Sequence, residues 1–325
     1  MRNAFIEELV SLATQYPHIA LVVGDLGYSV VEPFADRFPD RFINAGVAEQ
    51  NMTGLAAGMA SEGYHVFTYS IANFPTFRCA EQIRNDVDYH RLPVTVVSVG
   101  GGLAYGALGY SHHAVQDYAL MRSFPNLLIA APGDPMEVRA CMRYLAGNPQ
   151  PSYLRLGKAG EPNFHTTVPD VAPGKWLKVA DGVDRGDGRA TLLSTGAAMG
   201  IAMGWRNAPQ YHHHSVHSMP LWSMASKPDQ IAAVQPFDVV ETLEDHLRDG
   251  GFGSWLMEAV VGQPGVETRL RAHALTPAVC GTVGSQKMLN ALGGLGPVHR
   301  FDALGVIGAA DFSQIGLYQP SILRT

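Results

Sequence analysis

The sequence predicts an α/β protein built from two doubly wound domains. Short apolar runs recur along the chain, stretches with helical spacing lie between most of them, and this alternation pauses once and then resumes. Apolar strands of five or six residues separated by helices are typical of a parallel sheet covered on both faces. At roughly 100–200 residues per domain, a chain of 325 residues also favours two domains.

The first domain is expected over residues 1–165. Its apolar runs predict buried strands at 19–23, 64–70, 94–99, 126–131 and 152–157, and its helical patterns lie at 3–16, 45–62, 78–90, 114–123 and 134–147. Ligands of such sheets bind beyond the carboxyl ends of the strands. The loops that follow strands, at Gly24-Asp25-Leu26, after Tyr69 and at Gly100-Gly101-Gly102, are therefore the first places to look for a site.

Residues 166–189 interrupt the pattern with several Pro and Gly residues and little periodicity, which is typical of a linker. The alternation resumes in a second, smaller domain expected over 190–325. Strands are predicted at 190–196, 214–219, 238–244 and 270–275, and helices at 197–207, 226–234 and 253–261. The last 25 residues are weakly patterned and indicate no element.

Composition excludes several classes of protein. The net charge is −6 with no basic patch, which argues against a nucleic-acid partner, and no apolar run approaches the roughly 18 residues of a membrane span. The three cysteines are far apart and odd in number, so free thiols in a reducing compartment are expected. The N-terminus lacks the apolar core of a signal peptide. We therefore expect a cytoplasmic protein that binds neither nucleic acid nor membranes.

Glu49 is the first candidate functional residue. It begins an Ala- and Gly-rich helix within GVAEQNM (46–52), and by itself such a glutamate is more typical of a charge that complements the helix dipole. Phe74 and Phe77 follow a neighbouring strand and by themselves are more typical of core residues. Together, the three could form a pocket with a stacking wall and one carboxylate, which is what a flat heteroaromatic cofactor needs.

Further motifs agree in residues and in spacing with one known family. They are Arg2, Gly24-Asp25-Leu26 with Ser29, GVAEQNM, Phe74 and Phe77, AEQIRN (80–85), SHH (111–113), ALMRSFPNL (119–127), SYLRLGK (152–158), ETLEDHLRDGGFGS (241–254) and CGTVGSQ (280–286). Over nearly its whole length the chain resembles the C-terminal half of transketolase, as found in split, two-gene transketolases. The resemblance implies a thiamine-diphosphate pyrimidine-binding domain followed by a transketolase C-terminal domain.

The resemblance also implies roles for particular residues. Glu49 matches the catalytic glutamate that hydrogen-bonds N1′ of the cofactor's aminopyrimidine ring, Phe74 would stack on that ring, and Phe77 would line the same pocket. Asp25 matches an aspartate near the cofactor at the subunit junction, although capping of its own loop is an equal alternative.

For the substrate, the resemblance implies a phosphate held by Arg2, Ser29 and Arg155, since guanidinium groups and a hydroxyl suit a phosphate. His112 matches a catalytic histidine that contacts the sugar near the reacting carbons. The match leaves open whether His112 or His113 faces the cofactor, so both are candidates for substrate binding.

The half that binds the diphosphate through Mg²⁺ is missing from this sequence. Gly186-Asp187-Gly188 resembles the start of the family's metal motif, but no asparagine pair follows, and the consecutive histidines His212–His214 would diverge, so no metal site is expected in this chain. The resemblance implies a separate N-terminal-type subunit that supplies the Mg²⁺ ligands, with two copies of each subunit in a heterotetramer.

Two departures from the family concern the substrate. Transketolases usually carry histidine at the position of Gly100, and Gly-Glu-Asp-Gly where this chain reads Gly106-Ala107-Leu108-Gly109. Leu108 cannot accept the hydrogen bond of a sugar hydroxyl as the usual aspartate does. We expect a less hydroxylated, modified or branched sugar, or a 2-oxo acid donor, in place of an ordinary pentose or hexose phosphate pair.

Three functions are compatible with these observations. Transfer of a two-carbon ketol unit by a two-component transketolase-like enzyme is favoured. The β-subunit of a 2-oxo acid dehydrogenase or decarboxylase shares the pyrimidine domain, but ETLEDHLRDGGFGS and SYLRLGK favour transketolase. A regulatory or scaffolding relic of the fold is the third, and the presence of Glu49, Phe74 and Phe77 together argues against it. The sequence does not name the donor or the acceptor.

Overall fold

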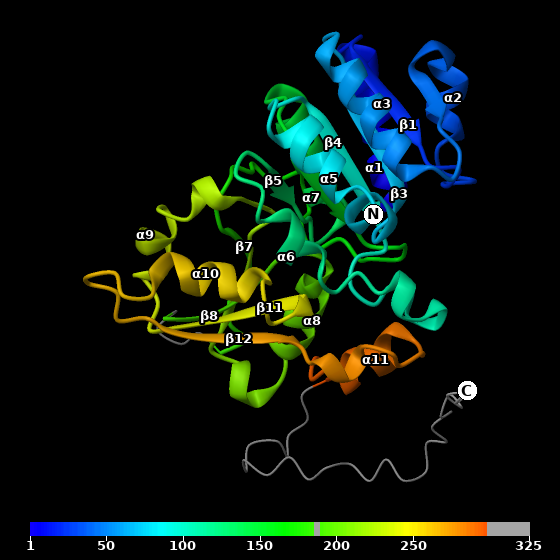
Figure 1. Cartoon of the computed structure of the whole chain (residues 1–325). Coiled ribbons are helices and arrows are strands. Elements are labelled where there is room, and N and C mark those ends of the chain that lie inside the picture. The colour runs from blue at the N-terminus through cyan, green and yellow to red at the C-terminus, as the bar shows by residue number, and fades with distance from the viewer. Residues whose placement is uncertain (185–188, 298–325) are drawn as a thin grey trace, which may run out of the picture.

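The computed structural model describes residues 1–184 and 189–297, and within these ranges the chain forms two sheets (Figure 1). The first has the strand order β10-β5-β6-β4-β3-β1-β2 and is parallel except for the pairing of β10 with β5. The second has the order β12-β11-β8-β9-β7 and is parallel except for the pairing of β7 with β9. The predicted α/β class with two wound sheets is confirmed.

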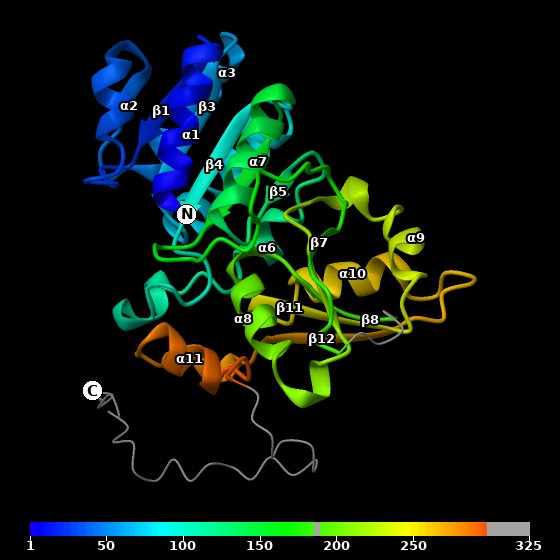
Figure 2. The ribbon, with the colours of Figure 1, turned by 180° about the vertical axis from the view of Figure 1, so that it is seen from behind.

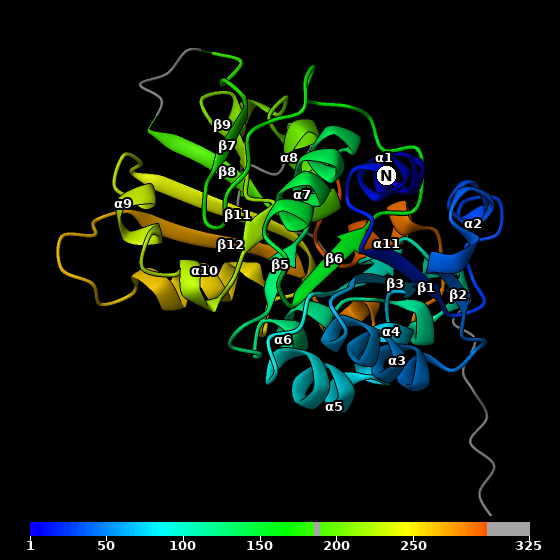
Figure 3. The same ribbon diagram turned by 90° about the horizontal axis from the view of Figure 1, so that it is seen from above.

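Helices cover both faces of the first sheet, whose strands are β1 (Ile19–Val23), β2 (Phe42–Asn44), β3 (His65–Ile71), β4 (Val94–Val99), β5 (Leu128–Ala130), β6 (Ser152–Leu156) and β10 (Leu221–Trp222). On one face, α1 (Arg2–Gln15) and α7 (Pro135–Gly147) pack against each other, with α2 (Glu32–Arg37) beside α1. On the other face lie α3 (Glu49–Ser61), α4 (Phe74–Phe77), α5 (Ala80–Gln82) and α6 (Asp117–Met121) (Figure 3). Alternate side chains of β1, Leu21 and Val22, enter the two apolar clusters on either side.

The second sheet is built in the same way from β7 (Leu177–Ala180), β8 (Ala190–Ser194), β9 (Ser215–Ser218), β11 (Val239–Leu247) and β12 (Arg269–Leu275). Its helices are α8 (Met199–Trp205), α9 (Gln230–Val234), α10 (Phe252–Val260) and α11 (Gln286–Leu292). Neighbouring residues of β8 again point to opposite faces: Leu192 packs with α8, and Leu193 packs with α10. Figures 1 and 2 show these two helices on opposite sides of the second sheet.

The structure differs from the expected division in two places. Strand β7 lies within the segment expected as a linker and joins the second sheet, where it is hydrogen-bonded on one side only. Strand β10, from the expected second domain, returns to pair with β5 in the first sheet. Both strands are too short to show a periodic pattern in the sequence, since β7 has four residues with a half-exposed pattern and β10 has two residues.

β10 also joins the two cores. The Trp222 ring lies 5.3 Å from the Trp255 ring of α10 and 5.3 Å from the Tyr118 ring of α6, measured between centroids. These buried rings belong to one apolar cluster that runs from the first sheet into the second. Burial of such large rings contributes substantially to packing, so the two sheets are held together by a shared core.

Residues 78–90 are expected as one helix, but the chain forms the short α5 and then a π-helical segment at Ile83–Asp88. No helix in the described part of the chain is both long and apolar enough to cross a membrane. Gly186–Gly188 and the C-terminal residues 298–325, including the final 25 that indicated no element, lie outside the described residues.

Candidate active site

The predicted site residues gather at the carboxyl end of the first sheet, the edge at which parallel sheets bind ligands. Asp25 follows β1, Phe74 follows β3, Gly100 follows β4, and Lys158 lies two residues after β6. Glu49 is the first residue of α3, which comes after β2. Arg2, the first residue of α1, reaches the same edge, because its Nε donates to the carbonyl of Lys158 at 2.6 Å.

Glu49 has an unusual environment for a carboxylate. Its side chain is 3% exposed, and its Oε2 accepts a hydrogen bond from Nη1 of Arg78 at 3.1 Å. Its Oε1 is buried and has no hydrogen-bond partner among the described residues. A buried acceptor left without a donor costs about 1–3 kcal/mol, so a hydrogen-bond donor supplied from outside the chain would stabilise this oxygen.

Arg78 connects Glu49 to an aromatic pair. Its guanidinium carbon lies 4.3 Å from the centroid of the Phe74 ring, a cation–π geometry. The Phe74 ring in turn meets the ring of His112 edge-on, with centroids 5.3 Å apart. Glu49, Arg78, Phe74 and His112 therefore form one row of contacts, although they come from three separate stretches of the chain.

His112 and His113 have different environments. His112 is partly buried, its Nδ1 lies 3.0 Å from the Ser111 hydroxyl, and burial, followed by the charges of His113 and Arg78, lowers its pKa. A neutral imidazole can accept as well as donate a proton. His113 is 1% exposed and its Nε2 lies 3.2 Å from the carbonyl of Gly106. His113 thus supports the loop through Nε2, while its buried Nδ1 has no hydrogen-bond partner among the described residues, so a substrate contact by His113 stays a prediction.

The positions of Phe77 and Asp25 give less support to a cofactor contact. Phe77, the last residue of α4, is 46% exposed, so within this chain it is not enclosed in a pocket with Phe74. Asp25 has a left-handed backbone (φ 55°), and its Oδ1 accepts hydrogen bonds from the Asn44 amide at 2.9 Å and the Tyr28 hydroxyl at 3.1 Å. These contacts favour the loop-capping alternative for Asp25 and leave a cofactor contact as a proposal.

A cavity of about 210 Å³ opens beside this row of residues. Its lining comes from the ends of α1, β1, β3 and β4 and from the following loops, and comprises Arg2, Leu26, Gly27, Tyr28, Tyr69, Ser70, Ile71, Val99 and Tyr105. Lys158 lies at the same place, with its Nζ 5.2 Å from the centroid of the Tyr105 ring. Ser29 is exposed next to the cavity, and its backbone N–H donates to Glu32 at 2.7 Å. Arg2 and Lys158 thus bring two cations to one small cavity.

The structure does not support a substrate contact by Arg155. Its side chain is 2% exposed and every guanidinium nitrogen is bound by the protein. Nε donates to Asp117 at 2.7 Å, Nη1 to Asp245 at 2.5 Å, and Nη2 to the carbonyl of Ala114 at 2.8 Å. Asp117 lies in α6 and Asp245 in β11, so Arg155 instead ties the two sheets and the loop of His112 together.

The C-terminal part of the chain also holds that loop. The N–H of Gly284 donates to the carbonyl of Gly106 at 3.3 Å, and a side-chain carbon added at Gly106 would lie 2.5 Å from Leu289 of α11. In Figure 1 the loop lies between the first sheet and α11. The C-terminal part of the chain therefore supports the loop that carries His112.

Sequence reasoning missed three residues of this site: Arg78, Lys158 and Tyr105. Arg78 lies four residues after Phe74, a spacing that allows contact on one helical face, and Lys158 ends the SYLRLGK motif beyond a predicted strand. The sequence therefore held a signal for both Arg78 and Lys158. Tyr105 lies in a loop without periodicity and carried none.

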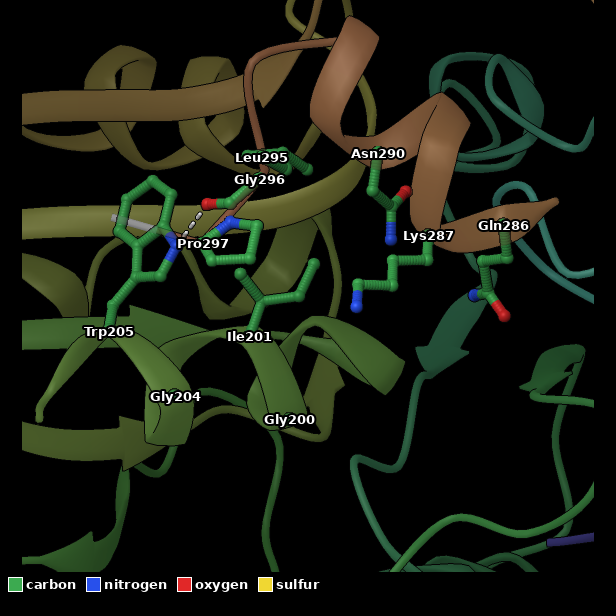
Figure 4. Close-up of a pocket in the computed structure, with 10 residues that line it drawn as sticks. All are labelled: Gly200, Ile201, Gly204, Trp205, Gln286, Lys287, Asn290, Leu295, Gly296 and Pro297. Atoms are coloured by element: carbon green, nitrogen blue, oxygen red, sulfur yellow. Dashed lines mark hydrogen bonds between the residues drawn. The ribbon is translucent and has the colours of Figure 1, made fainter. Parts of the chain in front are cut away.

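A second cavity, of about 400 Å³, lies between α8 and α11 (Figure 4). Its lining is Gly200, Ile201, Gly204, Trp205, Gln286, Lys287, Asn290, Leu295, Gly296 and Pro297, and it includes none of the predicted site residues. Trp205 closes one end by donating its Nε1–H to the carbonyl of Gly296 at 2.9 Å.

Known proteins share this fold and sequence. Residues 1–160 match the family model described as the transketolase pyrimidine binding domain. A putative transketolase C-terminal section of Methanocaldococcus jannaschii is 34% identical over 277 residues, covering 83% of this chain and 84% of the relative. One of the subunits of the apulose-4-phosphate transketolase of Phocaeicola vulgatus is 31% identical over 269 residues, covering 81% and 84%. A solved split-gene transketolase, described as an inactive β4 tetramer, superposes with a TM-score of 0.75 at 28% identity, covering 91% of this chain and 93% of that one.

The fold and these relatives thus define a subunit of a transketolase-like transferase that carries the pyrimidine binding domain, and this family implies dependence on thiamine diphosphate. The chain belongs to the transketolase family and corresponds to the C-terminal half of a split transketolase.

Proposed function

We propose that this chain binds the aminopyrimidine ring of thiamine diphosphate through Glu49 and acts, with a separate diphosphate-binding subunit, in the transfer of a two-carbon ketol unit. The observation that carries the proposal is the buried, unpartnered Oε1 of Glu49 beside the Phe74–Arg78 contact. A planar heteroaromatic ring needs an aromatic face and a hydrogen-bonding partner at its edge, and both are present here.

Each residue has a separate task in this proposal. Thiamine diphosphate, when bound, supplies the carbanion chemistry that ketol transfer requires. Arg78 holds Oε2 of Glu49 and thereby leaves Oε1 as the acceptor for a proton shared with the ring edge. Phe74 provides the aromatic surface. His112, whose pKa is lowered chiefly by burial, can take a proton from a sugar hydroxyl or return it.

The diphosphate and Mg²⁺ are assigned to the partner subunit. Among residues 1–184 and 189–297, no group of three or more His, Cys, Asp or Glu side chains could hold a metal ion. An α2β2 assembly accounts for this division of the site. Gly54 and Gly58 of α3 have open space where a side chain would stand, so backbones can approach closely at this surface.

We assign the anionic end of the substrate to Arg2 and Lys158, with Ser29 beside them. Two cations at one cavity suit a phosphate, and the P. vulgatus relative is named for a sugar 4-phosphate. Leu108 is 57% exposed on the loop of His112 and offers no hydrogen bond. This supports a substrate with fewer hydroxyl groups than ordinary sugar phosphates, or a modified or branched one.

The test uses the chain co-purified with an N-terminal-type partner, thiamine diphosphate and Mg²⁺. Glu49→Gln should lower the rate of ketol transfer about 10²–10⁴-fold while the assembled mass, measured by light scattering, stays the same. Glu62→Gln, at the exposed end of the same helix, is the matched control and should keep full activity. A near-normal rate for Glu49→Gln would refute its role.

Two further results would redirect the proposal. Sustained release of carbon dioxide from pyruvate, without ketol transfer, would favour the 2-oxo acid decarboxylase alternative. Micromolar binding of thiamine diphosphate by the isolated chain would contradict the division of the cofactor site between two subunits.

A further inference from the structure

Tyr105 occupies the space that a side chain at position 100 would need. A Cβ atom added at Gly100 would lie 2.0 Å from Cε2 and 2.3 Å from Cδ2 of the Tyr105 ring. Gly100 also has a φ of +85°, a backbone conformation that glycine adopts more easily than other residues. A histidine at position 100, as is usual in the family, would therefore require a strained backbone and a shift of Tyr105, whose phenol ring occupies this space.

The ring lies between the two ends of the proposed substrate site. On one side, the Tyr105 and His112 rings are 6.4 Å apart between centroids, in an edge arrangement. On the other side, Nζ of Lys158 lies 5.2 Å from the same ring, and Tyr105 lines the cavity together with Arg2. A substrate that reaches from His112 to the two cations must pass along this ring.

The chemistry of that surface differs from the family's. The face of a phenol ring contacts C–H groups favourably and accepts hydrogen bonds only weakly, so a hydroxyl held against it loses its water without gaining a partner. In the described part of the chain the Tyr105 hydroxyl makes no hydrogen bond, and Cδ2, Cε2 and Cζ of the ring lie over Gly100. Leu108 on the same loop adds no polar group.

We propose that Tyr105 is a specificity-determining residue that makes this site select phosphorylated acceptor aldehydes that lack a hydroxyl on the carbons between the aldehyde group and the phosphate. The inference rests on the proposed function for the location of the substrate, and it adds the residue and the chemical feature that decide the selection. An apolar surface discriminates against an added hydroxyl by about ten- to hundredfold, which sets the size of the effect.

The experiment compares three unreactive probes, n-propyl phosphate, glycerol 3-phosphate and inorganic phosphate, by calorimetry with the assembled two-subunit enzyme. The wild type should bind propyl phosphate about tenfold or more tightly than glycerol 3-phosphate. In Tyr105→Ala this ratio should fall to about threefold or less, whereas Tyr105→Phe, which keeps the ring, should preserve it. Inorganic phosphate should bind equally to the wild type and Tyr105→Ala and more weakly to Arg2→Ala.

Controls separate this inference from loss of folding and from the proposed function. Tyr89→Ala removes a 77% exposed ring and should leave every affinity unchanged. If Tyr105→Ala unfolds, Tyr105→Leu takes its place and should partly lower the ratio of the affinities for propyl phosphate and glycerol 3-phosphate. Equal binding of the two alkyl phosphates by the wild type, or an unchanged ratio in Tyr105→Ala, overturns the proposal. Both results come from binding measurements and need no turnover. A failure of the Tyr105 proposal can therefore be told apart from a failure of ketol transfer in the Glu49 experiment.

Discussion

Replacing Arg155 by leucine should cost most of the stability of the contact between the two sheets. The substitution removes the hydrogen bonds to Asp117 and Asp245, at 2.7 and 2.5 Å, and a third bond to the carbonyl of Ala114 at 2.8 Å. Asp117 and Asp245 are 0% and 2% exposed, so water cannot replace the lost partner. Burial already raises the pKa of Asp245, and Arg155 opposes that rise.

The magnitude follows from the burial. Removing one partner of a buried ion pair costs about 3–5 kcal/mol. Two carboxylates share Arg155, but Asp245 can take up a proton once its partner is gone, so we expect a loss of about 3–5 kcal/mol rather than twice that amount. Against a total stability of about 5–15 kcal/mol for a folded domain, this is a large fraction. Arg155→Lys should recover part of the loss, since an ammonium group satisfies one carboxylate.

Urea unfolding followed by tryptophan fluorescence measures the effect, because Trp222 and Trp255 are buried at this contact. Lys175→Met is the control, since Lys175 pairs with the 93% exposed side chain of Asp170 and should contribute about 0–1 kcal/mol. A loss below about 1 kcal/mol for Arg155→Leu, together with a raised KM for phosphorylated substrates, would refute the structural role and restore the expectation that Arg155 binds the substrate phosphate.

Two further predictions concern buried polar groups. Burial, with a smaller effect of His18, lowers the pKa of His65 to about 3, so the folded chain keeps this ring neutral while the unfolded chain takes up a proton below about pH 6.5. The stability that this group contributes is present above about pH 6.5 and is lost as the pH falls towards 3, by about 1.4 kcal/mol per pH unit. His65→Gln should therefore be less stable than the wild type at about pH 7.5, and the difference in unfolding free energy between the two, measured by urea titration, should narrow at about pH 6 and 5. A difference that stays constant with pH would contradict the assignment. Asp134→Ala should lower stability by about 2–4 kcal/mol, because Asp134 accepts from the backbone N–H of Glu137 at the start of α7 and from those of Phe164 and His165 at 2.8 Å each. Thermal unfolding measures this loss, and Asp134→Asn should retain part of the stability. Equal unfolding midpoints for Asp134→Ala and the wild type would show that water replaces the side chain.

The long apolar strands were the most predictable part of the fold. β1 and β4 were predicted residue for residue, at 19–23 and 94–99, because a buried parallel strand is a continuous apolar run that a sequence displays directly. The weak elements were not predictable. β7 is half exposed, β10 has two residues, and α11 follows a Gly-rich turn, so their existence depends on the partners they pack against.

The sequence by itself determined which residues reach the carboxyl end of the first sheet. Glu49 begins a helix, Phe74 follows β3, and His112 lies in the long loop after β4; the direction of a parallel strand decides the edge at which the next loop emerges. Their motifs also match the transketolase family, to which the sequence relatives assign the chain.

Only the tertiary structure decided where each side chain points. His112 and His113 are neighbours in the sequence, yet one lies against Phe74 and the other is buried under Gly106. Arg155 matched a phosphate ligand in its motif, but aspartates 38 residues before it and 90 residues after it take up its guanidinium group. Contacts over such separations arise only when the sheets assemble, so local patterns give the position of a residue on the sheet edge and long-range packing decides what its side chain can bind.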